Sequence, residues 1–202
     1  MRPNPPPNYL AGYPAHLVDS VRHAIAQGKL AGALLGKYPQ AHDIRTDRAL
    51  YEYVQDIRNR HLKNTAALSK VAYDSKLQTL QKALGTHTAI GRVQGGRIKA
   101  KREIRIAGLF RDMPGDFLRM IVVHELAHLK ESEHNKSFYQ LCRHMGPDYF
   151  QLEFDLRAYL SYLDAGGEAL WAISPASGQD GPGNAKGPPE QAALGRCKPL
   201  SG

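Results

Sequence analysis

The length, composition and charge of the chain exclude several classes of protein. With 202 residues, of which 42% are hydrophobic and 23% charged, the chain can bury the core of one soluble domain. No apolar run approaches the roughly 20 residues that a membrane-spanning helix needs. Cys142 and Cys197 lie far apart and provide no disulfide framework. We therefore expect a cytoplasmic protein with no membrane partner.

The first part of the chain shows the apolar spacing of amphipathic helices. Thr46 and Asp74 precede two of these periodic segments and are expected helix N-caps. Glycine or proline follows several of them, as is usual at helix ends. Helices are therefore predicted over residues 14–27, 30–35, 46–61 and 74–85.

The pattern changes to that of β-structure after residue 85. Residues 86–93 contain β-branched side chains, and Gly95–Gly96 is typical of a hairpin turn. Residues 103–107 alternate charged and apolar side chains, which predicts a strand with one buried face. We expect the strands of a small sheet in this region.

The next helix, expected to begin at Asp116, contains the pattern His-Glu-x-x-His. His124 and His128 are four residues apart, so their imidazoles lie one turn apart on one face. Two nitrogens in that arrangement can bind one metal ion. Glu125 lies beside the expected metal, where its carboxylate can take a proton from a bound water.

His134 is the expected third metal ligand. Six further residues of continuous helix would turn His134 by about 120° from the face of His128. The helix must therefore end between Lys130 and His134. Asn135 is a suitable N-cap for a following helix that ends near Gly146, and Asp148 is one for the last helix.

Three histidines are neutral nitrogen donors, a set that suits Zn²⁺ with a fourth position open for water. Bound zinc lowers the pKa of that water to about 7. Glu125 would accept the proton of the water and return it to the leaving group. The pattern therefore predicts a zinc-dependent hydrolase, most often of peptide bonds.

The sequence resembles the YgjP-like metallopeptidase family, which is related to the SprT-like zinc proteases. The resemblance covers about residues 86–163 and is most specific over 121–149. It rests on three segments, which are 122–129 with 134–139, Pro147-Asp148-Tyr149, and Ile104-Arg105-Ile106.

The resemblance implies an α+β fold, a compact zincin-like domain that is mostly helical with a small antiparallel sheet over the active-site helix. It also implies that His124, His128 and His134 bind the metal and that Glu125 is the general base of a peptidase. The metzincins share the histidine spacing but carry glycine where this chain has Glu131, which argues against that group.

Other residues are weaker candidates for the site. Glu131 and Glu133 could hold a histidine N–H, although both are more often exposed loop carboxylates. An oxyanion could be stabilised by Tyr139, Tyr149 or Arg157, although packing or surface roles are as compatible with the pattern.

A basic strip over residues 92–111 holds seven Lys or Arg residues against Glu103 alone. It could bind nucleic acid or another polyanion, or be a solvated face. Strand 103–107 could also pair with an extended substrate, and Arg105 and Lys101 would then favour acidic or phosphorylated substrates.

Two alternatives to a peptidase remain at this point. One is a metal-dependent hydrolase of nucleotides or phosphate esters, and the other is a nucleic-acid-associated protease or adaptor. For the domain organisation, we expect a disordered segment 1–12, a single domain 13–172 with N-terminal helices 13–85 and a catalytic core 86–165, and a disordered tail 173–202. The sequence does not indicate an oligomeric state.

Overall fold

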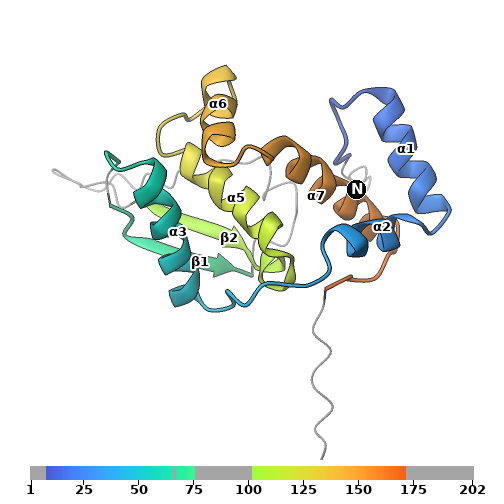
Figure 1. Cartoon of the computed structure of the whole chain (residues 1–202), viewed down its shortest axis with the longest axis horizontal. Coiled ribbons are helices and arrows are strands. Elements are labelled where there is room, and N and C mark those ends of the chain that lie inside the picture. Colours follow the sequence, from blue (N-terminus) through green and yellow to red (C-terminus); the bar gives the residue numbers. More distant parts are fainter. Residues whose placement is uncertain (1–7, 66, 76–101, 172–202) are drawn as a thin grey trace, which may run out of the picture.

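The computed structural model describes residues 8–65, 67–75 and 102–171 (Figure 1). The N-terminal helices are α1 (Ala15–Ala26), α2 (Leu30–Lys37) and α3 (Asp47–His61). These positions confirm three of the predicted helices. The Thr46 hydroxyl accepts a hydrogen bond from the backbone N–H of Ala49 at 3.2 Å, which confirms the predicted N-cap of α3.

The sheet in the described residues pairs β1 (Lys70–Asp74) with β2 (Glu103–Ala107). The strands run parallel, with Val71 opposite Ile104 and Tyr73 opposite Ile106. The expected antiparallel sheet is therefore wrong. Parallel strands need a long crossover connection rather than a tight turn, and residues 75–102 separate these two.

Strand β2 confirms the predicted strand at residues 103–107, whereas β1 was not predicted. Val71, Ala72 and Tyr73 are all buried, so β1 lacks the alternation that identifies a strand with one wet face. Asp74 is the last residue of β1. The rest of the predicted helix 74–85, the strand at 86–93 and the hairpin at Gly95–Gly96 lie outside the described residues.

The second half of the chain supplies the central helix. A short 3₁₀ segment, η1 (Gly108–Asp112), joins β2 to α5 (Gly115–Ala127), and α6 (Lys136–Met145) and α7 (Tyr149–Asp164) follow. Helix α5 contacts β2, α3, α6 and α7, and it runs through the middle of the molecule (Figure 1). Its Phe117, Ile121 and Val122 are fully buried, which anchors the helix that carries the histidines.

One predicted N-cap is displaced in the structure, and another is at the predicted residue but makes no side-chain capping bond. Pro114 occupies the N-cap position of α5, so Asp116 lies inside the first turn. Asp148 is the N-cap residue of α7, but its side chain makes no capping hydrogen bond. Its two carboxylate oxygens instead accept hydrogen bonds from the Arg119 guanidinium at 2.8 and 2.6 Å. This pair joins α5 to the start of α7, and it holds the pKa of Asp148 below its usual value.

Trp171 closes the described part of the chain against the core. Its indole N–H donates to the Tyr38 carbonyl at 2.7 Å, and its ring contacts Phe117 and Tyr159. Within the described residues, no helix combines the length and the apolar character needed to cross a bilayer. The cytoplasmic location and the segment boundaries at residues 12 and 172 stay predictions.

Candidate metal centre

The loop after α5 brings the third histidine back to the first two. Helix α5 ends at Ala127, and the backbone N–H groups of Lys130 and Glu131 both bond to the Ala127 carbonyl at 3.0 Å. The predicted break in the helix is thus confirmed, at a slightly earlier residue. The side chain of Asn135 then accepts a hydrogen bond from the backbone N–H of Phe138 at 2.9 Å, which confirms it as the N-cap of α6.

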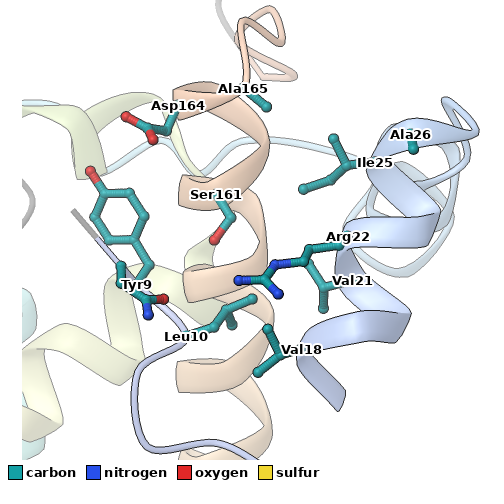
Figure 2. Close-up of a pocket in the computed structure, with 11 residues that line it drawn as sticks. Tyr9, Leu10, Val18, Val21, Arg22, Ile25, Ala26, Ser161, Asp164 and Ala165 are labelled. Atoms are coloured by element: carbon teal, nitrogen blue, oxygen red, sulfur yellow. The ribbon is translucent and has the colours of Figure 1, made fainter. Parts of the chain in front are cut away.

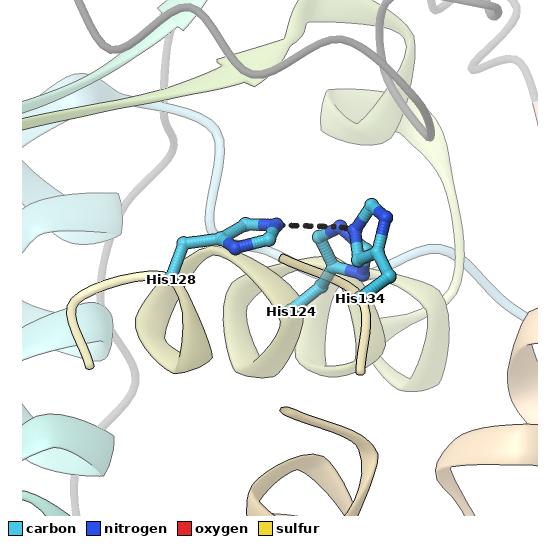
Figure 3. Close-up of side chains that lie close together, drawn as sticks. All are labelled: His124, His128 and His134. Atoms are coloured by element: carbon cyan, nitrogen blue, oxygen red, sulfur yellow. Dashed lines mark hydrogen bonds between the residues drawn. The ribbon is translucent and has the colours of Figure 1, made fainter. Parts of the chain in front are cut away.

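The three histidine rings face a common point (Figure 3). The Nε2 atom of His124 lies 3.2 Å from Nε2 of His128 and 3.2 Å from Nε2 of His134. Four ligands placed tetrahedrally, with metal–nitrogen bonds of about 2.0–2.1 Å, would be separated by about 3.3–3.4 Å. The spacing therefore fits three ligands of one ion, and the three side chains form a group that could hold a metal.

The opposite ring nitrogens of two histidines have partners in the protein. Nδ1 of His128 lies 2.9 Å from the backbone carbonyl of Glu131, and Nδ1 of His124 lies 2.7 Å from the Tyr149 hydroxyl. A carbonyl accepts only, so Nδ1 of His128 carries the proton and its Nε2 has the lone pair that a metal ion would bind. Glu131 thus contacts the expected ligand His128 through its main-chain carbonyl, whereas the sequence offered its carboxylate as a weaker candidate.

An apolar wall separates the triad from the core. The Phe138 ring is fully buried, and its centroid lies 4.5–5.0 Å from the centroids of all three imidazoles. His124 is buried against this wall, whereas His128 is partly accessible. The site is therefore closed on the Phe138 side.

Glu125 follows His124 directly on α5 and is half-buried. Burial raises the pKa of its carboxyl to about 7. A carboxylate with a pKa near neutrality is suited to accept a proton and to give it up again. The role of Glu125 as a base and those of the three histidines as ligands stay predictions, and the geometry is compatible with all four.

The other predicted site residues have different surroundings from those expected. Tyr149 lies behind His124, on the Nδ1 side, and is not placed for an oxyanion at the metal. The Arg157 guanidinium donates hydrogen bonds to the Glu153 carboxylate at 2.6 Å and to the Tyr9 carbonyl at 3.0 Å. Tyr139 stacks on His134 with a centroid separation of 6.2 Å.

Part of the basic strip is also described. Arg105 pairs with Asp74 at 3.0 Å on the neighbouring strand, so its charge is partly neutralised. Arg102 donates a hydrogen bond to the carbonyl of Leu129, the residue after His128, at 3.3 Å. Residues 92–101 lie outside the described residues, and binding of nucleic acid by the strip stays a prediction.

A cavity of about 290 Å³ lies elsewhere in the molecule, between the N-terminal segment, α1 and α7 (Figure 2). Its wall is largely apolar, with Leu10, Val18 and Ile25, and its polar groups include Arg22 and Asp164. None of the triad histidines lines it. The cavity is therefore separate from the candidate metal centre.

Comparisons with known proteins identify relatives of this chain. Residues 46–159 match the model of the YgjP-like family, which is described as a metallopeptidase domain. The chain is 56% identical over 158 residues to the UTP pyrophosphatase of Escherichia coli (strain K12), covering 78% of this chain and 95% of that protein. No solved structure is significantly similar.

The match to this family supports a metal-dependent hydrolase, and the three histidines on α5 and the loop that follows it could hold the metal ion. Within that class, the chain belongs to the YgjP-like family, because the family model matches more than half of its length. The predicted family is thereby confirmed.

Proposed function

We propose that the protein is a zinc-dependent nucleoside triphosphate pyrophosphohydrolase that converts UTP to UMP and pyrophosphate. The metal site is proposed because the Nε2 atoms of the three histidines converge. The substrate rests on the 56% identity to the UTP pyrophosphatase, which extends over 95% of that protein. The nucleotide hydrolase that the sequence offered as an alternative thus becomes the first candidate.

The proposed reaction needs one base and one site for the water. A bound zinc ion supplies positive charge that lowers the pKa of water and stabilises the charge developing on phosphate. Glu125 takes the proton of the attacking water. The water oxygen forms a bond to the α-phosphorus, and the bond from that phosphorus to the bridging oxygen breaks. Pyrophosphate leaves with the bonding electrons and is protonated by Glu125 or by solvent.

Arg102 is the basic residue that we propose for binding the triphosphate. Its side chain is exposed, and its hydrogen bond to the Leu129 carbonyl places the guanidinium near the end of α5 that carries His128. Guanidinium groups bind phosphate oxygens through two parallel hydrogen bonds. Arg105 is a poorer candidate because Asp74 and Glu103 already pair with it.

The test is hydrolysis of UTP by zinc-loaded protein in water enriched in ¹⁸O, with products separated by anion exchange and analysed by mass spectrometry. We expect UMP and pyrophosphate in equal amounts, with the label in UMP. Label in pyrophosphate would place the attack on the β-phosphorus. Absence of UTP turnover in protein that carries stoichiometric metal would contradict the proposal. ATP, CTP and GTP measured in parallel define the preference for the base.

Peptide hydrolysis is the second candidate, and the description of the family model as a metallopeptidase domain favours it. The His-Glu-x-x-His pattern and a base beside the metal would serve that reaction equally well. The same preparation should be incubated with a proteome-derived peptide library. Cleavage that disappears in Glu125→Gln, with no turnover of UTP, would establish the peptidase and remove the pyrophosphohydrolase.

A further inference from the structure

A buried chain of polar groups extends from His124 away from the expected metal. The Tyr149 hydroxyl lies 2.7 Å from Nδ1 of His124, and the two rings are nearly parallel. Tyr149 is 1% exposed, His124 6% and Glu153 7%. Polar groups at this depth need partners, so their connections determine how each of them is oriented.

The next two groups lie on the same stripe of α7. Tyr149, Glu153 and Arg157 are spaced four residues apart and therefore occupy one face of the helix. Glu153 lies one turn from Tyr149 on this face, and its carboxylate interacts with the Tyr149 hydroxyl. The Arg157 guanidinium donates two hydrogen bonds to Glu153, at 2.9 and 2.6 Å. Arg157 compensates the buried carboxylate, and also donates to the Tyr9 carbonyl at 3.0 Å.

The direction of the hydrogen bonds follows from the position of the metal site. Nε2 of His124 faces the other two histidines, so the ring proton belongs on Nδ1, where it is donated to the tyrosine oxygen. A tyrosine hydroxyl has one proton, and Glu153 is the anion that can accept it. The Cys142 thiol also borders this hydroxyl, but burial raises its pKa to about 12, so no second anion competes.

His124 and His128 differ in the groups that contact their Nδ1 atoms. His128 donates to a neutral backbone carbonyl, whereas His124 is connected through one hydroxyl to a buried carboxylate. A carboxylate behind a metal-bound imidazole orients the ring and increases the basicity of the coordinating nitrogen. The chain from α7 therefore links the imidazole of His124 to the charge of Glu153.

We propose that Tyr149 and Glu153 are positioning residues for His124 and that they set its metal affinity. The Tyr149 hydroxyl fixes the orientation of the imidazole ring, and the Glu153 charge acts on the ring through that hydroxyl. The proposal rests on the metal site of the proposed function and not on its substrate. Metal binding is measured without nucleotide, so failure of this proposal and failure of UTP hydrolysis are distinguishable.

The experiment compares three variants by competition for Zn²⁺ with a chromophoric chelator. Tyr149→Phe removes the hydroxyl, Glu153→Gln keeps a hydrogen-bond acceptor but removes the charge, and Tyr159→Phe is the control. Tyr159 is also a buried tyrosine of α7, and its hydroxyl accepts from the Leu170 backbone, away from the triad. Loss of an outer-sphere partner typically weakens metal binding about 10–100-fold.

We expect Tyr149→Phe to weaken zinc binding by that factor, Glu153→Gln to weaken it by about tenfold, and Tyr159→Phe to leave it within twofold of wild type. The visible absorption of the Co²⁺-loaded protein should shift in the first two variants and not in the third. A role confined to stability would lower the unfolding temperature without changing the affinity of the folded protein. Zinc affinity within twofold of wild type in folded Glu153→Gln overturns the proposal, even where Tyr149→Phe does not fold.

Discussion

The side chain of Asn135 accepts a hydrogen bond from the backbone N–H of Phe138, and this bond caps α6 at the residue that directly follows His134. The cap therefore sets the position of a metal ligand as well as the start of a helix. Phe138, in the first turn, also packs against all three imidazoles. Asn135 thus couples the capping of α6 to the geometry of the metal site.

Replacing Asn135 by alanine should cost about 1 kcal/mol in the free energy of unfolding, the usual effect of losing a side-chain cap. We expect zinc affinity to fall as well, by up to about fivefold, because 1 kcal/mol spent on ordering His134 corresponds to that factor. Urea unfolding of the metal-free protein and chelator competition measure the two effects separately.

Thr46→Ala is the matched control for this prediction. Thr46 caps α3 through its bond to the Ala49 backbone, and it belongs to a helix that carries no triad residue. It should lose similar stability and keep the zinc affinity of wild type. Equal losses of affinity in both variants would show that the cap acts only through global stability.

The parts of the site that were predictable from the sequence are those that local geometry determines. His124 and His128 share a face because of the helical repeat, and the break before His134 follows from the angle per residue. Asn135 caps its own helix within three residues. Each of these relationships is decided within a few residues of sequence, so pattern reasoning was sufficient.

The parts that failed depend on packing between distant segments. Strand β1 pairs with a strand beyond residue 102, and neither its partner nor the parallel direction is encoded within its five residues. Asp148 lost its expected capping role because Arg119, on another helix, binds its carboxylate. Tyr149 reached His124 only because α7 packs on α5. Short-range sequence patterns do not reveal such contacts between distant segments.

Glu125→Gln should lower kcat for UTP by about 10²–10⁴-fold, the usual contribution of a positioned general base. Zinc content should remain stoichiometric, because an amide of the same size leaves the three histidines in place. Glu52→Gln is a control for charge removal, since Glu52 pairs with Arg48 on the exposed surface of α3. Retained turnover in Glu125→Gln would assign the base to another residue.

Glu125→Gln, which should lower activity, should raise the stability of the metal-free protein at high pH. Burial raises the pKa of Glu125 to about 7 in the folded state, above the value of about 4.3 for an unfolded glutamate. Folding thus favours the protonated carboxyl, so its contribution is fully present below about pH 4 and is lost as the pH rises through about 7.

In a chelating buffer at pH 8, Glu125→Gln should therefore unfold at a higher urea concentration than wild type. The difference should shrink towards zero near pH 4, where both side chains are neutral. Loading with zinc should also reduce the difference at pH 8, because a nearby cation favours the charged carboxylate. A wild-type protein that is the more stable of the two at pH 8 without metal would contradict the burial of this group.

Arg102→Ala should raise KM for UTP and leave zinc affinity unchanged, if the guanidinium contacts the triphosphate. An exposed charge interaction contributes about 1 kcal/mol, so an increase in KM of about fivefold is expected, and it should diminish at high salt. Arg105→Ala is the control, because that arginine is already paired with Asp74 and Glu103.

The hydrogen bond from Arg102 to Leu129 offers a different role, in which the side chain only holds the end of α5. That role predicts weaker zinc binding with an unchanged KM, so measuring both quantities in one preparation separates substrate binding from support of the helix.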